Sequence, residues 1–182
     1  MSKRALILID IQNDYFAGGK WSLHGMDTAT ANAARVLAAA RAAGDTVVHV
    51  RHEFESMDAP FFAPGSTGAH IHAEVQPLAG EAVVLKHKVN AFLGTDLKAR
   101  LDEAGIEQII LVGAMSHMCI DAAARASADF GYATTVIHDA CATRDQEFDG
   151  KQVPAAQVQA AYMAALAFAY ATVTSTEQYL AG

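Results

Sequence analysis

Three residues of this sequence, Asp10, Lys86 and Cys119, have side chains that together could cleave a chemical bond. A thiolate is a strong nucleophile, a carboxylate can accept the thiol proton, and an ammonium group stabilises a thiolate beside it. Cys119 stands between the apolar run 108–112 and residues 120–130, which have helical spacing, so we expect it to open a helix. Backbone N–H groups and the positive end of the helix dipole would then lower the pKa of its thiol.

The elements that must position these residues follow one another in a regular order. Short apolar runs, which predict strands, lie at residues 5–9, 46–50, 82–86, 108–112, 134–138 and 172–174. Helical patterns alternate with them, from Thr28 to about Ala43, from Thr95 to near Gly105, and over residues 120–130 and 155–171. This alternation predicts a parallel sheet covered by helices on both faces, in a single domain over residues 1–182.

The three reactive residues fall at equivalent places in that sheet. Asp10 ends the first predicted strand, Lys86 ends the third, and Cys119 follows the fourth. Parallel sheets bind ligands at the carboxyl ends of their strands, so we expect all three side chains to face one crevice. Residues 51–80 hold three of the four prolines and no clear period, and a loop of that length is usually functional.

The chain resembles the isochorismatase-like cysteine hydrolases, a group that includes nicotinamidases, N-carbamoylsarcosine amidohydrolases and ureidoacrylate amidohydrolases. The resemblance covers most of the chain. It is carried by four segments in the family's order, namely the Asp-x-Gln-x-Asp turn within 6–16, the lysine segment 86–95, the nucleophile loop 113–119, and the strand region 131–140. It implies a three-layer α/β/α, Rossmann-like fold whose six-stranded parallel sheet has the order 3-2-1-4-5-6.

The resemblance also implies a mechanism. Asp10, Lys86 and Cys119 would form a catalytic triad that cleaves a small amide, ureido or carbamoyl C–N bond through a thioester on Cys119, without a cofactor. The backbone N–H groups of Met115 and Cys119 would bind the oxyanion, and the peptide bond between Ala114 and Met115 would be cis. Tetrahedral oxyanions need such paired donors.

Two of these assignments have rivals in the sequence. Lys88 competes with Lys86, but the family lysine lies six residues before a phenylalanine, and Phe92 counts back to Lys86. Asp14 competes with Asp10, but we expect it to brace the loop in which it lies.

Cys141 follows a predicted strand and is expected to have a packing role. A redox disulfide with Cys119 is the alternative, and it requires a Cα separation below about 7 Å.

Several histidines raise the question of a metal. The nicotinamidases of the resembled family bind one through an Asp-x-His pair and further histidines. Here the corresponding residues 49–55 contain no Asp-x-His. We therefore expect no metal at His49, His52, His70 and His72, and the same departure argues against nicotinamide as the substrate.

Aromatic and sulfur-containing side chains are candidates for the substrate pocket, because such pockets are mostly apolar with a few polar groups. The candidates are Phe16, Trp21, His52, Phe92, His117 and Met118, with Phe54, Phe61 and Phe62 as further possibilities. The loops around Trp21 and over residues 54–62 could fold over the site as a lid, or come from a neighbouring subunit.

The composition limits the classes of partner. The net charge of −7 argues against nucleic acid, and the sequence has no run of eighteen apolar residues that would span a membrane. We see no secretory leader, and the two cysteines favour a reducing cytoplasm. Residues 155–171 form an apolar stretch with almost no charge, so a subunit interface could bury it, and we expect a homo-oligomer acting on a small molecule.

Other activities are less compatible with the sequence. A dinucleotide-dependent dehydrogenase is disfavoured because no Gly-x-Gly-x-x-Gly follows the first strand. Two alternatives stay open. One is an isochorismatase-type hydrolase that cleaves a vinyl ether and releases pyruvate, and the other is a non-catalytic redox or ligand-binding protein on the same fold.

Overall fold

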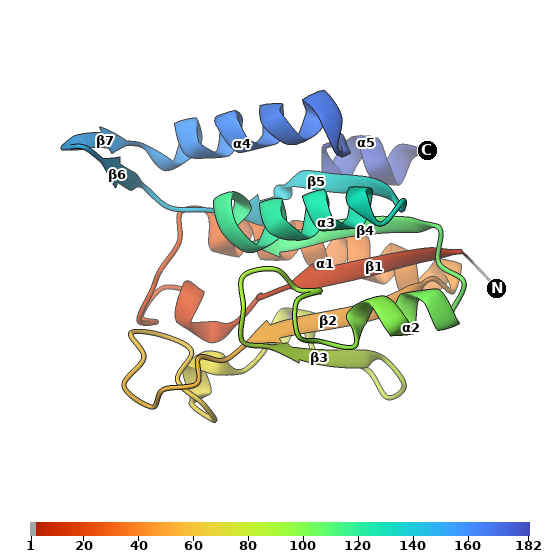
Figure 1. The fold of residues 1–182 in the computed structure, drawn as a ribbon, viewed down its shortest axis with the longest axis horizontal. Coiled ribbons are helices and arrows are strands. Elements are labelled where there is room, and N and C mark those ends of the chain that lie inside the picture. Colours follow the sequence, from red (N-terminus) through yellow and green to blue (C-terminus); the bar gives the residue numbers. More distant parts are fainter. Residues whose placement is uncertain (1–2) are drawn as a thin grey trace.

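A parallel sheet forms the centre of the computed structural model, which describes residues 3–182 (Figure 1). Met1 and Ser2, the first residues of the predicted domain, lie outside the described residues. The six strands are β1 (Arg4–Ile9), β2 (Thr46–His52), β3 (Ala82–Lys86), β4 (Gln108–Ala114), β5 (Ala133–Ala142) and β8 (Thr172–Thr174). Their order is β3-β2-β1-β4-β5-β8 and every neighbouring pair is parallel, which confirms the predicted fold class and the order 3-2-1-4-5-6.

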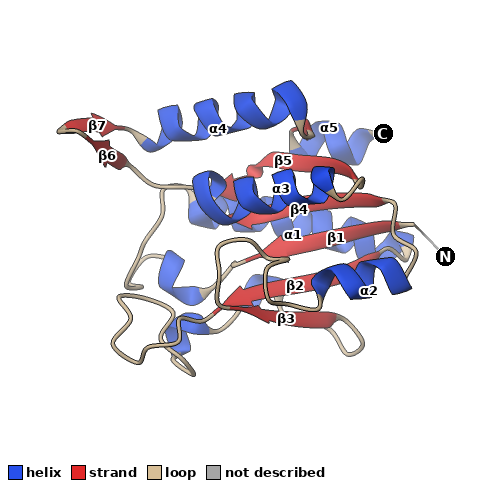
Figure 2. Cartoon of the chain, in the orientation of Figure 1, coloured by secondary structure: helices blue, strands red, loops and turns tan. Residues whose placement is uncertain are grey.

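Helices cover both faces of the sheet (Figure 2). One face carries α1 (Met26–Ala43) and α5 (Thr176–Ala181), and the other carries α2 (Leu97–Glu103), α3 (Asp121–Asp129) and α4 (Ala155–Ala169). The sequence of β1 is apolar after Arg4 because both of its faces are buried. Leu6 and Leu8 belong to the core under α1, whereas Ala5, Ile7 and Ile9 belong to the core on the opposite face. A strand buried on both faces has no polar side to alternate with.

Three local features differ from the sequence-based expectations. Helix α1 begins at Met26 after Gly25, whose φ of 68° is left-handed, rather than at Thr28. A β-hairpin of β6 (Gln146–Phe148) and β7 (Lys151–Val153) projects beyond the sheet, where no strand was predicted (Figure 1). The helix after β4 is preceded by a π-helical turn, Ser116–Ile120.

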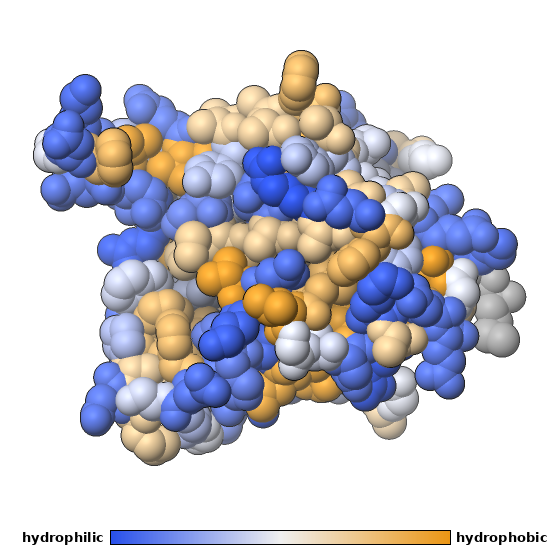
Figure 3. Space-filling model, viewed as in Figure 1, coloured by the Kyte–Doolittle hydropathy of each residue, from blue (hydrophilic) through white to orange (hydrophobic). Residues whose placement is uncertain are grey.

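Helix α4 is buried on one side and open on the other. Ala155, Val158, Met163 and Leu166 are buried, whereas the side chain of Phe168 is 91% exposed. In Figure 3 the outer surface of α4 is coloured mostly as apolar. Burial on most sides was predicted, but within one chain this helix has packing partners along a single face. Within residues 3–182, no helix combines the length and apolar character needed to cross a membrane.

Candidate active site

The ends of three neighbouring segments bring Asp10, Lys86 and Cys119 together. Lys86 Nζ lies 2.8 Å from Asp10 Oδ2 and 3.3 Å from Cys119 Sγ. The side chains of Asp10 and Lys86 are fully buried, and Cys119 is 6% exposed. An ammonium group thus lies within hydrogen-bond distance of both a carboxylate and a sulfur in a place shielded from water.

The parallel sheet places these residues by its register. His52, the last residue of β2, pairs with Lys86, the last residue of β3. Asp10 follows β1 and donates its backbone N–H to Val50 in β2, with a left-handed φ of 53°. Gly113 of β4 lets that strand approach β1, because a Cβ on Gly113 would lie 2.0 Å from the carbonyl oxygen of Ile9.

Cys119 lies inside the π-helical turn rather than at the first turn of the α-helix that was predicted. The carbonyl of Met115 accepts from the backbone N–H groups of Met118 and Ile120, the residues on either side of Cys119. The peptide bond between Ala114 and Met115, the bond for which the resemblance implies a cis form, is cis.

The thiol of Cys119 has a different electrostatic setting from the one expected. Burial, and after it the charge of Asp10, raise its pKa to about 12, and the opposing effect of Lys86 is smaller. The prediction that this pKa is lowered is therefore wrong, because the cost of burying a thiolate exceeds the stabilisation that Lys86 provides. A raised pKa favours the neutral thiol, so ionisation of Cys119 calls for a base.

Asp10 can serve as that base. Its Oδ2 forms an ion pair with Lys86, and both of its carboxylate oxygens are buried without a hydrogen bond from another residue within 3–182. Burial opposes the charge on Lys86, but Asp10 and Cys119 together outweigh it and raise the pKa of the ammonium. Lys86 therefore stays a cation, as a partner for Asp10 and for a developing thiolate.

Asp10 and Cys119 line an inner cavity of about 220 Å³, and Lys86 is buried behind them. The walls of this cavity are mainly apolar and aromatic, and besides Asp10 and Cys119 they are formed by Tyr15, His52, Phe54, Phe61, His87, Lys88, Val89, Met115 and Met118. A cavity of this size suits a small molecule.

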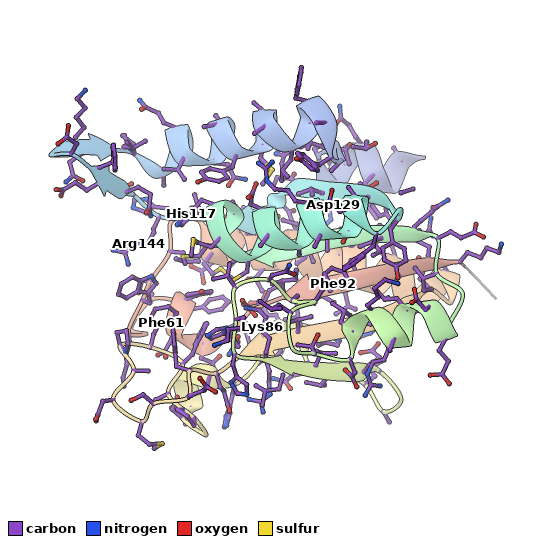
Figure 4. The ribbon with its side chains drawn as sticks, viewed as in Figure 1. Phe61, Lys86, Phe92, His117, Asp129 and Arg144 are labelled. Carbon is purple, nitrogen blue, oxygen red and sulfur yellow. The ribbon has the colours of Figure 1, made fainter. Side chains whose placement is uncertain are left out.

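An outer cavity of about 580 Å³ adjoins the inner one, and the two share Phe61, Met115 and Met118 as walls. The outer cavity is also lined by Trp21, His117 and Arg144, and by residues of the β6–β7 hairpin. The guanidinium carbon of Arg144 lies 4.2 Å from the centre of the Trp21 ring, and Trp21 stacks on Phe61 at 4.7 Å. Figure 4 shows Phe61, His117 and Arg144 at the end of the molecule toward which β1 and β2 run.

The structure separates the predicted pocket residues into two groups. His52 and Met118 line the inner cavity, and Trp21, His117 and Met118 line the outer one. Phe16 and Phe92 line neither cavity. The ring of Phe16 stacks on His72 at 3.8 Å, and Phe92 packs edge-on against Phe130 on the α3 face, where Figure 4 shows it apart from Arg144. Both are packing residues.

Lys88 and Asp14, the alternatives to Lys86 and Asp10, have other roles in the structure. The carbonyl of Lys88 accepts a hydrogen bond from Lys86 Nζ at 3.1 Å, and its side chain is exposed. Asp14 is buried and accepts the backbone N–H groups of Phe62 and Lys20. It therefore braces the long loop that supplies Phe61.

The four histidines considered as metal ligands have separate surroundings. His49 Nε2 lies 3.0 Å from Glu81, His52 Nδ1 lies 3.1 Å from Lys86 Nζ, and His72 accepts from the backbone of Glu74. No group of three His, Cys, Asp or Glu side chains within residues 3–182 has the arrangement of a metal site.

Cys141 is a buried free thiol opposite Gly113, and burial raises its pKa to about 12. Both cysteines are free in this structure. Sequence reasoning missed Arg144 and the hairpin residues of the outer cavity, because the three-residue strands on either side of Asp149 and Gly150 are too short for a periodic signal.

The comparisons with known proteins agree with this geometry. Residues 4–178 match the isochorismatase domain family. The chain belongs to the isochorismatase family. Its members are hydrolases, so the chain is a hydrolase of that family. It is 47% identical over 176 residues to YddQ, an uncharacterized isochorismatase family protein of Bacillus subtilis, covering 97% of this chain and 98% of that protein.

Two further similarities extend this family assignment. The crystal structure of a putative isochorismatase hydrolase from Oleispira antarctica superposes with a TM-score of 0.95 at 56% identity, covering 98% of this chain and 96% of that one. The ureidoacrylate amidohydrolase RutB of Yersinia enterocolitica is 28% identical, covering 82% of this chain and 80% of that protein. The family match confirms the resemblance on which the fold prediction depended.

Proposed function

We propose that this isochorismatase-family hydrolase cleaves the C–N bond of a small amide, ureido or carbamoyl compound, with Cys119 as the nucleophile. The observation that carries the proposal is the position of Lys86 Nζ, 2.8 Å from Asp10 Oδ2 and 3.3 Å from Cys119 Sγ, beside an inner cavity that Asp10 and Cys119 line. A base and a sulfur that share one cation are what acyl transfer to a thiol requires.

The reaction would begin with transfer of the thiol proton to Asp10, while Lys86 stabilises the thiolate that forms. The thiolate then attacks the substrate carbonyl carbon, and the backbone N–H groups of Met115 and Cys119 stabilise the oxyanion. Asp10 returns the proton to the leaving nitrogen, which departs as ammonia or an amine. Water then hydrolyses the thioester, again with Asp10 as the base, and restores the free thiol.

The outer cavity supports a substrate with an anionic end. Arg144 has no carboxylate partner within residues 3–182, and the indole N–H of Trp21 beside it is buried without an acceptor. Asp145 and Glu147 also line this cavity; Asp145 accepts the backbone N–H of Ala155 and Glu147 accepts the side-chain amide of Gln152, so each has a partner other than Arg144. Two unused donors next to the inner cavity favour a carboxylate, which is also a group of ureidoacrylate, the substrate in RutB's name.

A substrate panel tests the proposal. Small amides and ureido acids with and without a carboxylate are incubated with the enzyme, and released ammonia is measured beside pyruvate released from isochorismate. We expect ammonia, a covalent acyl adduct on Cys119 by mass spectrometry, and a loss of at least about a thousandfold in kcat for Cys119→Ser, with Cys141→Ser active. Pyruvate release, or turnover retained in Cys119→Ser, would contradict the proposal. A bound ligand without turnover would support the non-catalytic alternative.

Arg144 has a test of its own. Arg144→Gln should raise KM for carboxylate-bearing amides by about ten- to a hundredfold while uncharged amides are unaffected, because one charged hydrogen-bond partner is lost. Arg51→Gln is the matched control, since Arg51 pairs with Glu53 outside both cavities. Equal losses on charged and uncharged substrates would rule out a carboxylate contact.

A further inference from the structure

The ammonium group of Lys86 has four polar atoms around it and three hydrogens to give. It is hydrogen-bonded to His52 Nδ1 and the carbonyl oxygen of Lys88 at 3.1 Å and to Cys119 Sγ at 3.3 Å, and it forms an ion pair with Asp10 Oδ2 at 2.8 Å. An ammonium group carries three N–H donors and no acceptor. The carboxylate therefore competes with the three hydrogen-bonded acceptors for these hydrogens, and the sulfur, which is the most distant and a weak acceptor as a thiol, holds its hydrogen least strongly.

The contact with Lys86 determines the protonation state of His52. A group that only donates must find an acceptor, so Nδ1 of His52 carries no proton and the ring is neutral with its proton on Nε2. Burial and the charge of Lys86 lower the pKa of His52 to about 4, against the weaker effect of Asp10, with His87 as a further titratable neighbour. The buried Nε2 atom has no partner within the described part of the chain.

His52 is held firmly in this contact. Its pairing with Lys86 in the β2–β3 register places the two side chains side by side. The buried side chain of Gln12 binds both backbone groups of His52, accepting its N–H at 2.7 Å and donating to its carbonyl at 2.8 Å. The ring of Phe54 packs edge-on against the imidazole, with ring centres 4.7 Å apart. The acceptor at Nδ1 is therefore a fixed part of the site.

We propose that His52 is a positioning residue that accepts one hydrogen of Lys86 in the resting enzyme and releases it to Cys119 Sγ when the thiol ionises. The inference rests on the proposed function in one respect, namely that Cys119 is the nucleophile. In the step itself the S–H bond breaks, the proton binds Asp10 to form a carboxylic acid, and the electron pair stays on sulfur. The net charge of the three groups is unchanged, and one N–H of Lys86 turns from His52 Nδ1 to the thiolate.

This arrangement keeps the thiol protonated until a substrate arrives. A neutral thiol reacts far more slowly with oxidants and alkylating agents than a thiolate does. If Nδ1 is removed, three acceptors remain for three hydrogens, and one N–H of Lys86 faces the sulfur permanently. The thiolate is then stabilised before any substrate binds.

Alkylation of the full-length protein by iodoacetamide tests this without a substrate. The rate is followed across pH by mass spectrometry of the peptide that contains Cys119, which separates it from Cys141. His52→Leu, which removes the acceptor, should react about tenfold faster than wild type at neutral pH, equivalent to a fall of about one pKa unit. His52→Asn, whose side-chain oxygen can replace Nδ1, should stay within about twofold of wild type. His70→Asn, on the exposed loop, is the matched control and should not change the rate.

Equal or slower alkylation in His52→Leu would overturn the inference, and so would a rate for His52→Asn that matches His52→Leu. The wild-type protein offers a second measurement that needs no variant to fold. Nitrogen NMR shifts of the imidazole should show an unprotonated Nδ1 and a protonated Nε2 at neutral pH, and a protonated Nδ1 would contradict the inference. Both readouts are independent of amide hydrolysis, so a negative substrate panel leaves them interpretable.

Discussion

Asp14 accepts a hydrogen bond from the backbone N–H of Phe62 at 2.7 Å, although 48 residues separate them in the chain. Phe62 has a left-handed φ of 49°, which a bulky residue seldom adopts without support from its surroundings. The neighbouring Phe61 forms a wall of both cavities. A carboxylate outside the group of Asp10, Lys86 and Cys119 thus holds the loop that divides the two cavities.

Replacing Asp14 by Asn should loosen this loop. The amide presents a donor where two backbone N–H groups need acceptors, so we expect a loss of about 1–3 kcal/mol in the free energy of unfolding and a higher KM with a smaller change in kcat. Urea unfolding and steady-state kinetics measure the two effects. Asp58→Asn, on the exposed part of the same loop, is the control and should change neither. A variant as stable as wild type would show that Asp14 has no bracing role.

Replacing Lys86 by Met should destabilise the fold as well as abolish turnover. Asp10 would be left as a buried carboxylate without its cation, which typically costs about 3–5 kcal/mol. The double variant Asp10→Asn with Lys86→Met should recover much of that loss, because both buried charges are then gone. Urea unfolding measures the free energy of unfolding of each variant. Lys88→Met, at an exposed side chain, is the control and should lie within about 0.5 kcal/mol of wild type. Equal losses in the single and double variants would argue against coupling of the pair.

Glu81 should make the stability of the protein depend on acid pH. The hydrogen bonds from Arg41 are the largest cause of a pKa lowered from 4.5 to about 2, with His49 contributing. Because the folded pKa is depressed, the stabilisation is complete above pH 4.5 and is lost as the pH falls toward 2. Urea midpoints of wild type and Glu81→Gln should differ most above pH 4.5 and converge near pH 2. The exposed Glu55→Gln variant is the control. A difference between the urea midpoints of wild type and Glu81→Gln that stays constant with pH would contradict the role given to Glu81.

The open face of α4 is the surface on which we propose that a second copy of the chain packs. The helix has no charged side chain between Ala155 and Ala169, and Phe168 near its end is 91% exposed. Phe168→Glu should therefore shift the protein toward the monomer, because burying the new carboxylate between two helices is costly. Light scattering after size exclusion measures the mass. Phe148→Glu, at the exposed hairpin, separates a general effect of added charge from an effect of this face. A wild-type monomer would exclude the interface.

The sheet was predictable from sequence because β-strands buried on both faces are continuous apolar runs. The apolar runs at residues 5–9 and 108–112 predicted buried strands, and the strand order followed from the family resemblance. The grouping of Asp10, Lys86 and Cys119 was predictable for the same reason, since the ends of parallel strands meet at one edge.

Properties that depend on distances across the site could not be predicted. The pKa of Cys119 is set by burial and by Asp10, and neither is visible in a local helix pattern, so its direction came out opposite to expectation. Phe16 and Phe92 are close in sequence to triad residues but turn into the core, because proximity along the chain does not fix the direction of a side chain. Arg144 was also missed because its contact with Trp21 joins residues that are far apart in sequence.

Asp10 follows β1, and His52 and Lys86 end β2 and β3, so adjacent strands of one sheet hold all three residues and no hinge lies between them. The wall that Phe61 contributes comes instead from the loop held by Asp14, so substitutions in that loop can reshape the pocket without moving the sheet beneath it.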